Sequence, residues 1–146
     1  MSVSASIDIE LSAPNLQQVD VLRLLLEQGR VIYDNGYKSF LPINDKGMFN
    51  WQWVPISQFT DADLFAILSI KQSFQELIGV SLSWKDTDIG GEFLISDDLT
   101  LCISLTNNRR INTYGLTDFD WYLSRIIPAI DRDEIFIEDI SFTELN

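Results

Sequence analysis

Residues 47–84 read GMFNWQWVPISQFTDADLFAILSIKQSFQELIGVSLSW, and this stretch predicts a strand, a helix and a second strand in succession. Its first part places aromatic rings at Phe49, Trp51 and Trp53. Because the side chains of a strand alternate between its two faces, we expect these rings on one face and the intervening amides on the other. Apolar and polar residues alternate again over residues 80–84, which predicts the second strand.

Thr60 marks the start of the helix between these strands. Its hydroxyl can accept a hydrogen bond from the backbone N–H of Asp63, and two aspartates lie where the helix dipole favours negative charge. Apolar residues then recur at roughly helical spacing, so we predict a helix over Asp61–Ile78. The same start signal returns at Thr117, which predicts a second N-cap there.

Similar patterns extend outward in both directions. Strict alternation over residues 3–11 predicts a strand with one buried face, and residues 134–142 predict a last strand. Further helices are predicted over Pro14–Gln28 and Asp118–Ala129. Two β-rich pieces around the turn signal at residues 34–36 predict a hairpin. The helix positions that we expect to be buried are Leu22, Leu26, Leu64, Leu68, Leu123 and Ile127.

The order of these elements mixes adjacent strands with helical crossovers. It predicts a single α+β domain over residues 1–146, with two layers, an antiparallel or mixed sheet and about three helices. The first six elements match the order of a ferredoxin-like βαββαβ unit. Apolar residues make up 46% of the chain and aromatic residues 12%, so a packed core is expected.

The charge balance restricts the kinds of partner. The chain has 22 acidic and 10 basic residues and a formal charge of −12, which repels nucleic-acid phosphates and anionic lipids. We therefore expect no nucleic acid and no membrane, but a basic or neutral protein. The start of the chain lacks the basic and apolar regions of a secretory signal, and the single Cys102 has no partner for an internal disulfide. Both observations favour the cytoplasm.

The residue inventory argues against an enzyme. The chain has no histidine, which excludes Ser-His-Asp triads, imidazole acid–base catalysis and ordinary zinc sites. Cys102 lies in an alternating run with no base near it in sequence, so we interpret it as a packed strand residue. Gly90 and Gly91 lack the further glycines and the lysine of a phosphate-binding loop. We predict no catalytic residue, no cofactor and no metal ligand.

One acidic segment resembles part of a calcium-binding loop. Asp86, Asp88, Gly91 and Asp97 occupy the first, third, sixth and twelfth places of such a loop. The fifth place is Gly90, which has no oxygen ligand to offer from a side chain, and strand signals follow where a helix belongs. A solvated loop between two strands therefore explains the segment better than a metal site does.

A second acidic segment, near the end of the chain, is our candidate for partner binding. Its four residues are Asp131, Asp133, Glu138 and Asp139, and they form either a contact surface for a basic protein or an ordinary solvated face. Small size, acidity and the lack of catalytic residues resemble, in composition alone, the immunity and antitoxin proteins that neutralise a toxin. The leading hypothesis is a non-enzymatic acidic protein-binding module that inhibits a basic partner protein, such as a toxin.

The alternative hypothesis is a small-ligand-binding or regulatory domain. In it, Phe49, Trp51 and Trp53 form the wall of a pocket, because aromatic rings on one strand face can stack against a flat ligand. The same rings can equally fill a core against a helix.

Overall fold

The computed structural model describes residues 3–27, 30–31 and 36–145. Its helices are α1 (Gln18–Glu27), α2 (Asp61–Ser73) and α3 (Phe119–Ile130). Its strands are β1 (Ser4–Ser12), β2 (Arg30–Val31), β3 (Tyr37–Phe40), β4 (Gln52–Pro55), β5 (Ile78–Trp84), β6 (Gly90–Ile95), β7 (Thr100–Asn107) and β8 (Phe136–Leu145).

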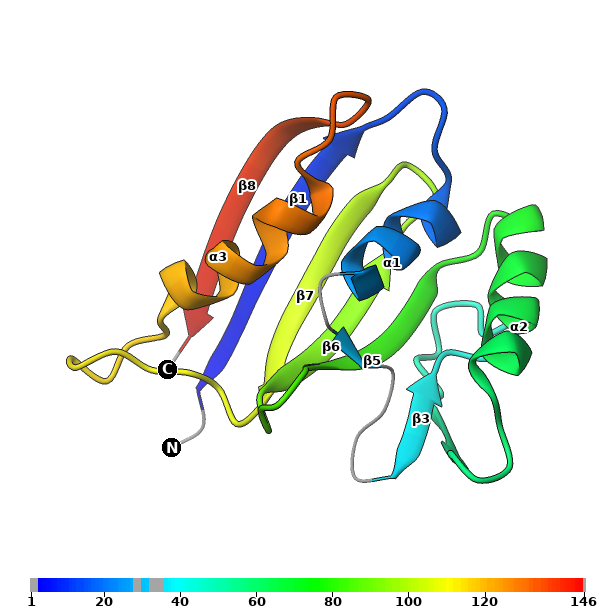
Figure 1. Ribbon diagram of the computed structural model, residues 1–146, viewed down its shortest axis with the longest axis horizontal. Helices are drawn as coiled ribbons and strands as arrows, with labels where there is room; N and C mark the ends of the chain where they lie inside the picture. Colours follow the sequence, from blue (N-terminus) through cyan, green and yellow to red (C-terminus); the bar gives the residue numbers. More distant parts are fainter. Residues whose placement is uncertain (1–2, 28–29, 32–35, 146) are drawn as a thin grey trace.

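The strands form an antiparallel sheet in the order β4-β3-β5-β6-β7-β1-β8, and β2 also pairs with β5. The first strand lies between two of the last ones, since Ile7 of β1 is opposite Ile103 of β7 and Phe142 of β8 (Figure 1). The two ends of the described chain are therefore neighbours in the sheet.

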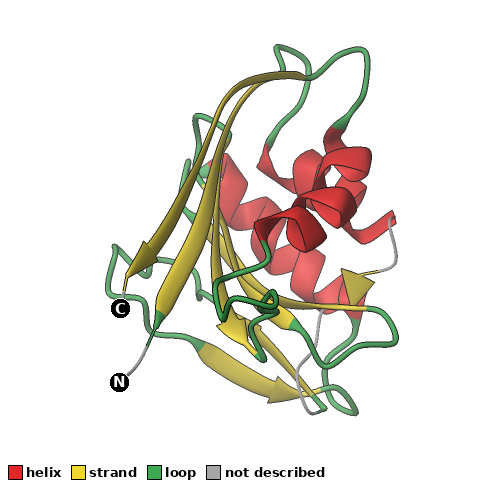
Figure 2. Cartoon of the chain, turned by 90° about the vertical axis from the view of Figure 1, so that its left-hand side faces the viewer, coloured by secondary structure: helices red, strands yellow, loops and turns green. Residues whose placement is uncertain are grey.

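The three helices cover one face of this sheet, and no helix of the described residues lies on the other face (Figure 2). Burial in β1 follows from this arrangement, because Ala5, Ile7, Ile9 and Leu11 are buried while the residues between them are not. The α+β class is thus confirmed. The sheet contains more strands than the predicted two-layer domain with about three helices implied.

The ferredoxin-like unit is not confirmed. In that unit the first strand pairs with later strands of the same unit, whereas the described part of β1 pairs with β7 and β8, which lie outside the first six elements. The described residues of the predicted hairpin also pair differently: β2 and β3 both pair with β5, through Arg30 opposite Trp84 and Phe40 opposite Val80. Most of its predicted turn, at residues 34–36, lies outside the described residues.

An aromatic cluster joins α3 to the sheet. The ring of Trp84 on β5 lies 5.4 Å from Tyr122, 5.5 Å from Trp121 and 5.8 Å from Phe93, measured between centroids. The buried Tyr122 hydroxyl accepts a hydrogen bond of 2.8 Å from the backbone N–H of Arg110. Edge-on aromatic contacts of this kind add to the energy of burial, so the cluster holds α3 in one position.

Two helix boundaries differ from prediction. Helix α2 ends at Ser73 because Gln75 adopts a left-handed conformation (φ 57°), and Ile78 begins β5 instead of ending the helix. Helix α1 begins at Gln18, four residues after Pro14, since residues 13–16 form a turn closed by the bond from Leu16 N–H to the Ala13 carbonyl.

The predicted apolar stripe was only partly right. Leu22, Leu64 and Leu68 are fully buried, as expected. The other three predicted positions are only half-buried, and each has a fully buried apolar or aromatic neighbour one residue earlier. Apolar residues are consecutive at these places, so helical spacing cannot select one of them. The half-buried positions are Leu26, Leu123 and Ile127, and the buried neighbours are Leu25, Tyr122 and Ile126.

Of the two predicted N-caps, the first is confirmed. The Thr60 hydroxyl accepts from the Asp63 N–H at 3.1 Å, and the Asp63 carboxylate accepts from the Thr60 N–H at 2.8 Å, which completes a capping box. At the second site the N-cap is Asp118, not Thr117, because the Thr117 side chain bonds to Glu144 of β8 instead. None of the helices in the described chain is long and apolar enough to cross a membrane.

We predict that Thr60→Ala lowers the free energy of unfolding by about 1 kcal/mol, because one N–H at the start of α2 loses its acceptor. Urea unfolding measures the change. Thr60→Ser keeps the hydroxyl and serves as the control, with most of the stability retained. Equal stability of the alanine and serine variants would contradict the capping role.

Candidate functional site

The last strand, β8, is a long strand at the edge of the sheet. It pairs with β1 on one side, and no described strand lies on its other side. Of its ten residues only Ile140 and Glu144 are half-buried, and the rest are exposed. Exposed apolar side chains include Phe136 (62% exposed) and Phe142 (45% exposed). An exposed edge of this length is a surface on which another chain can pair.

A bulge divides β8 into two parts. Asp139 is opposite Glu10 of β1 and Ile137 is opposite Leu11, so Glu138 is an extra residue with no partner position in the register. From Asp139 to Leu145 the register with β1 is unbroken. The regular part of the edge therefore begins at Asp139.

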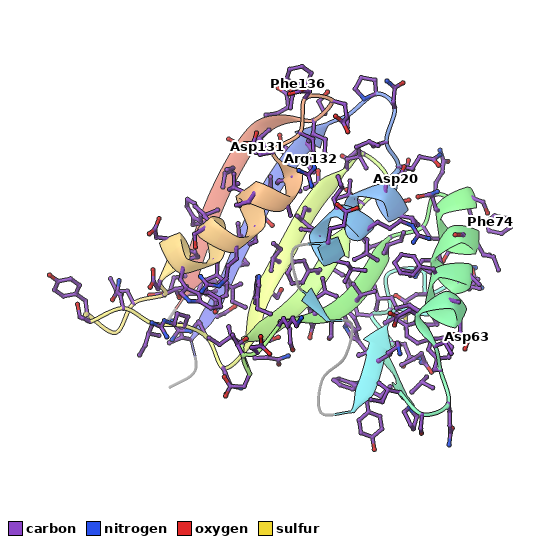
Figure 3. The ribbon with its side chains drawn as sticks, in the orientation of Figure 1. Asp20, Asp63, Phe74, Asp131, Arg132 and Phe136 are labelled. Carbon is purple, nitrogen blue, oxygen red and sulfur yellow. The ribbon has the colours of Figure 1, made fainter. Side chains whose placement is uncertain are left out.

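The structure places the four predicted partner-binding residues around the start of this strand. Asp131 and Asp133 lie in the turn between α3 and β8, Glu138 forms the bulge, and Asp139 begins the regular part. All four are exposed. We call this set the acidic border. Figure 3 labels Asp131, and it also labels Phe136, which projects from the same end of the molecule.

The far end of β8 is fixed by a partly buried polar cluster of Thr117, Arg109 and Glu144. Glu144 accepts hydrogen bonds from the hydroxyl and, at 2.8 Å, from the backbone N–H of Thr117, and Arg109 lies 3.4 Å from the same carboxylate. The bonds from Thr117, followed by the charge of Arg109, hold the pKa of Glu144 below its usual value. Glu144 therefore stays ionised and ties β8 to the loop before α3.

The face of the sheet that carries no helix is acidic. Glu10 and Asp139 are directly opposite each other on this face, and Asp8 lies two residues from Glu10 on the same strand. None of β1, β5, β6, β7 and β8 contains a lysine or an arginine. Like charges opposite each other destabilise a sheet. A cationic side chain from a binding partner would therefore interact favourably with these carboxylates.

Several basic residues are already engaged within the fold. Lys38 donates to the Phe59 carbonyl at 2.7 Å, and Arg132 pairs with Glu27 at 3.5 Å. Other guanidinium groups lie over aromatic rings, that of Arg125 at 3.7 Å from the centroid of Trp121. Because these cationic side chains already contact a backbone carbonyl, a carboxylate and aromatic rings, they do little to neutralise the negative charge of the open face.

Two groups on the open face, the Cys102 thiol and the Glu92 carboxyl, have raised pKa values. Burial, and secondarily the neighbouring carboxylate of Asp8, raises the pKa of the Cys102 thiol to about 12. A thiol with this pKa is protonated at neutral pH and is a poor nucleophile. Burial also raises the pKa of Glu92, which lies between Ser81 and Ser104 in the sheet.

The predicted aromatic strand is not formed as expected. Phe49 has a left-handed backbone (φ 53°), and β4 begins only at Gln52, so the three rings do not share one strand face. Phe49 is 49% and Trp53 is 53% exposed, while Trp51 is half-buried. None of the three lines the cavity beside Lys71, the one beside Cys102 or the one beside Gln72.

One cavity, of about 460 Å³, lies between the loop after β3 and the end of α2. Its buried Lys71 ammonium donates to the carbonyls of Leu41 at 3.0 Å and Pro42 at 2.9 Å, and Glu76 accepts from the Asn44 N–H at 2.7 Å. Burial lowers the pKa of Lys71, against the opposing charges of Glu76 and Asp45. These contacts hold the loop against α2. The lining residues are Ile43, Asn44, Asp45, Lys46, Gly47, Lys71, Phe74, Glu76 and Leu77.

The partial calcium-loop pattern is split by a strand. Asp86 and Asp88 lie in the turn before β6, whereas Asp97 lies in the turn after it. Six strand residues separate the two turns by about 20 Å, which is too far for one ion. Within the described residues, no group of three or more histidine, cysteine, aspartate and glutamate side chains could hold a metal ion.

The sequence pointed to the four residues of the acidic border as a candidate surface but did not indicate the bulge or the exposed edge beside them. The sequence signal for β8 was visible in its alternation, whereas its position at the edge of the sheet depends on β1, more than a hundred residues away. Comparison with protein-family models, curated proteins and solved structures found no match to this chain.

We predict that Glu92→Gln stabilises the protein at pH 7. A carboxylate whose folded pKa is raised costs stability while it is ionised, and this cost disappears as the pH falls through the folded pKa and below the ordinary value of 4.5. Urea unfolding of both proteins across this pH range should show a gain at pH 7 that shrinks in acid. An unchanged stability difference at every pH would contradict the role of burial; the exposed Glu134→Gln is the control.

We predict that Lys71→Met lowers the free energy of unfolding by about 2 kcal/mol, because two buried carbonyl oxygens lose their donor. Chemical denaturation provides the measurement. The matched variant Lys46→Met removes an exposed lysine from the same cavity and should change the stability by less than about 0.5 kcal/mol. If both variants behave alike, the ammonium of Lys71 does not hold the loop.

Proposed function

We propose that this chain is a non-enzymatic, acidic protein-binding module whose partner is a basic protein, with inhibition of the immunity or antitoxin type as its most concrete form. One observation carries the proposal: the exposed edge strand β8 contains two residues of the acidic border, Glu138 and Asp139, and no basic residue. A location in the cytoplasm, where a free thiol such as Cys102 is stable, is part of the proposal.

The inhibition would work by occlusion. Carboxylates of the acidic border complement a cationic cleft on the partner, and the bound module then excludes the substrate from that cleft. Phe136, exposed at 62%, supplies an aromatic side chain next to these charges. Aromatic residues surrounded by charged ones are frequent at the centres of protein interfaces, so the same end of the molecule offers both affinity and specificity.

The small-ligand alternative has less support. The cavity beside Lys71 is not lined by Phe49, Trp51 or Trp53, and the ammonium and carboxylates around it bond to the backbone of the chain itself. A small ligand would find apolar walls there but few free polar groups to orient it.

We predict that the partner associates with the module at a rate that falls steeply with ionic strength. The immobilised chain captures the partner from source cells, and association is then measured at several salt concentrations. The variant Asp133→Asn/Glu138→Gln/Asp139→Asn should associate about three- to tenfold more slowly at low salt, with a flatter salt dependence and little change in dissociation.

The matched control carries the same change in charge elsewhere. Asp86→Asn/Asp88→Asn/Asp97→Asn removes three exposed carboxylates from the two turns that flank β6. Its association rate should stay close to that of the unmodified chain. If the captured partner is acidic, or if its association rate does not change with salt concentration, the acidity serves solubility alone and the proposed function is wrong.

A further inference from the structure

We propose that the partner binds by strand addition: an extended segment of alternating basic and apolar residues pairs with the outer edge of β8 and continues the sheet. This inference rests on the proposed function, because it takes the partner to be basic. It adds the binding mode, the seven residues that are paired and the sequence pattern of the segment.

The backbone of β8 provides the first argument. In a strand, alternate residues turn their N–H and C=O groups to opposite sides, so half of these groups in β8 face away from β1. No described residue pairs with them. Ten residues make an edge of about 33 Å, at the long end of the range for strands in globular proteins. Such an edge can form several backbone hydrogen bonds with an added strand.

The bulge limits the paired region. At Glu138 the edge is interrupted, and only Asp139–Leu145 keeps a regular register with β1. An added strand needs a regular edge, since the spacing of its hydrogen bonds is fixed. The partner segment therefore pairs with about seven residues.

The negative charge of β8 determines which kind of chain can pair with this edge. β8 carries Glu138, Asp139 and Glu144 and no basic residue. A second copy of the chain would bring the same three carboxylates to the contact, and like charges between neighbouring strands are unfavourable. A bulge and charged residues are also the means by which proteins prevent edges from pairing with copies of themselves. The exposed Glu138 and Asp139 attract a basic segment, whereas Glu144 is already bound to Thr117 and Arg109.

The side chains of β8 define the pattern of the segment. Ile140 and Phe142 face the helices, where the Phe142 ring lies 4.9 Å from Phe119, yet Phe142 remains 45% exposed. Asp139 and Ser141 face the open, acidic side of the sheet. Neighbouring strands place side chains of the same face side by side. Apolar residues of the segment would therefore cover Phe142 and Ile140, and basic residues would meet Asp139.

The test uses a synthetic peptide of alternating lysine and valine, nine residues long, with both ends blocked. Amide hydrogen exchange of the full chain is measured with and without the peptide. We expect alternate amides of Asp139–Leu145 to exchange at least tenfold more slowly when the peptide is bound. A peptide of the same composition in two blocks, lysines first and valines second, should give no such protection. Absence of protection by millimolar alternating peptide would overturn the proposal.

Two N-methylated peptides separate strand addition from attraction by charge alone. Each carries methyl groups on alternate backbone nitrogens, one set on each edge of the peptide, so charge and side chains are the same in both. We take the added strand to run antiparallel to β8, as in every strand pair of the described residues. In that direction only one edge of the peptide can pair with β8, so one peptide should lose at least tenfold in affinity while the other stays within about threefold of the parent.

Equal affinities of the two N-methylated peptides would overturn strand addition while leaving the proposed function intact, because charge would then explain the binding. The proposed function fails on a different result, the salt response of the captured partner. Protection of β8 that rises with protein concentration in the absence of peptide would identify a second copy of the chain as the occupant and would also overturn the inference.

Discussion

The pairing of β1 on both sides holds this structure together. β1 joins β7 to β8 through continuous registers, and its side chains Ile7 and Ile9 are fully buried beneath the helices. These pairs connect residues about a hundred positions apart, so the sheet closes only when the two ends of the chain meet. Such long-range pairing is slow to form because the loop entropy is lost before the contacts are made. One consequence is that β8 lies at the edge of the sheet, where no described strand pairs with its outer side.

The one-sided position of the helices determines the surface chemistry. Most apolar side chains of β1, β5, β6 and β7 point to the helices, and the opposite face carries serines, threonines and carboxylates together with Leu94 and Cys102. The lysines at positions 38 and 71 are buried and donate to backbone carbonyls. A large share of the positive charge is thus used to hold the fold, and the open face is more acidic than the balance of 22 acidic and 10 basic residues suggests.

The acidic edge costs stability in the free protein. Glu10 and Asp139 are opposite each other, and a pair of like charges in this position is unfavourable. A basic side chain placed between or beside them would remove that cost, which adds to the affinity for a cationic partner. The same edge of the sheet therefore combines a preference for a basic partner with a backbone to which a strand can be added.

The sequence by itself determined the features that depend on neighbouring residues. Alternation along residues 3–11 indicated which side of β1 is buried, Thr60 and Asp63 fixed the start of α2, and the lack of histidine excluded most acid–base chemistry. It also identified the acidic border, although not the strand edge beside it. Local patterns suffice for these features because the interactions span only a few residues.

Only the tertiary structure decided the rest. Phe49 takes a left-handed backbone where alternation predicted a strand, and Thr117 bonds to Glu144 across 27 residues instead of capping α3. Leu25 is buried in α1 in place of Leu26, and Tyr122 and Ile126 are buried in α3 in place of Leu123 and Ile127, because apolar residues are adjacent there and packing selects among them. The free edge of β8 exists because β1 occupies its other side. Contacts between distant residues fix each of these features, and no local pattern of the sequence contains them.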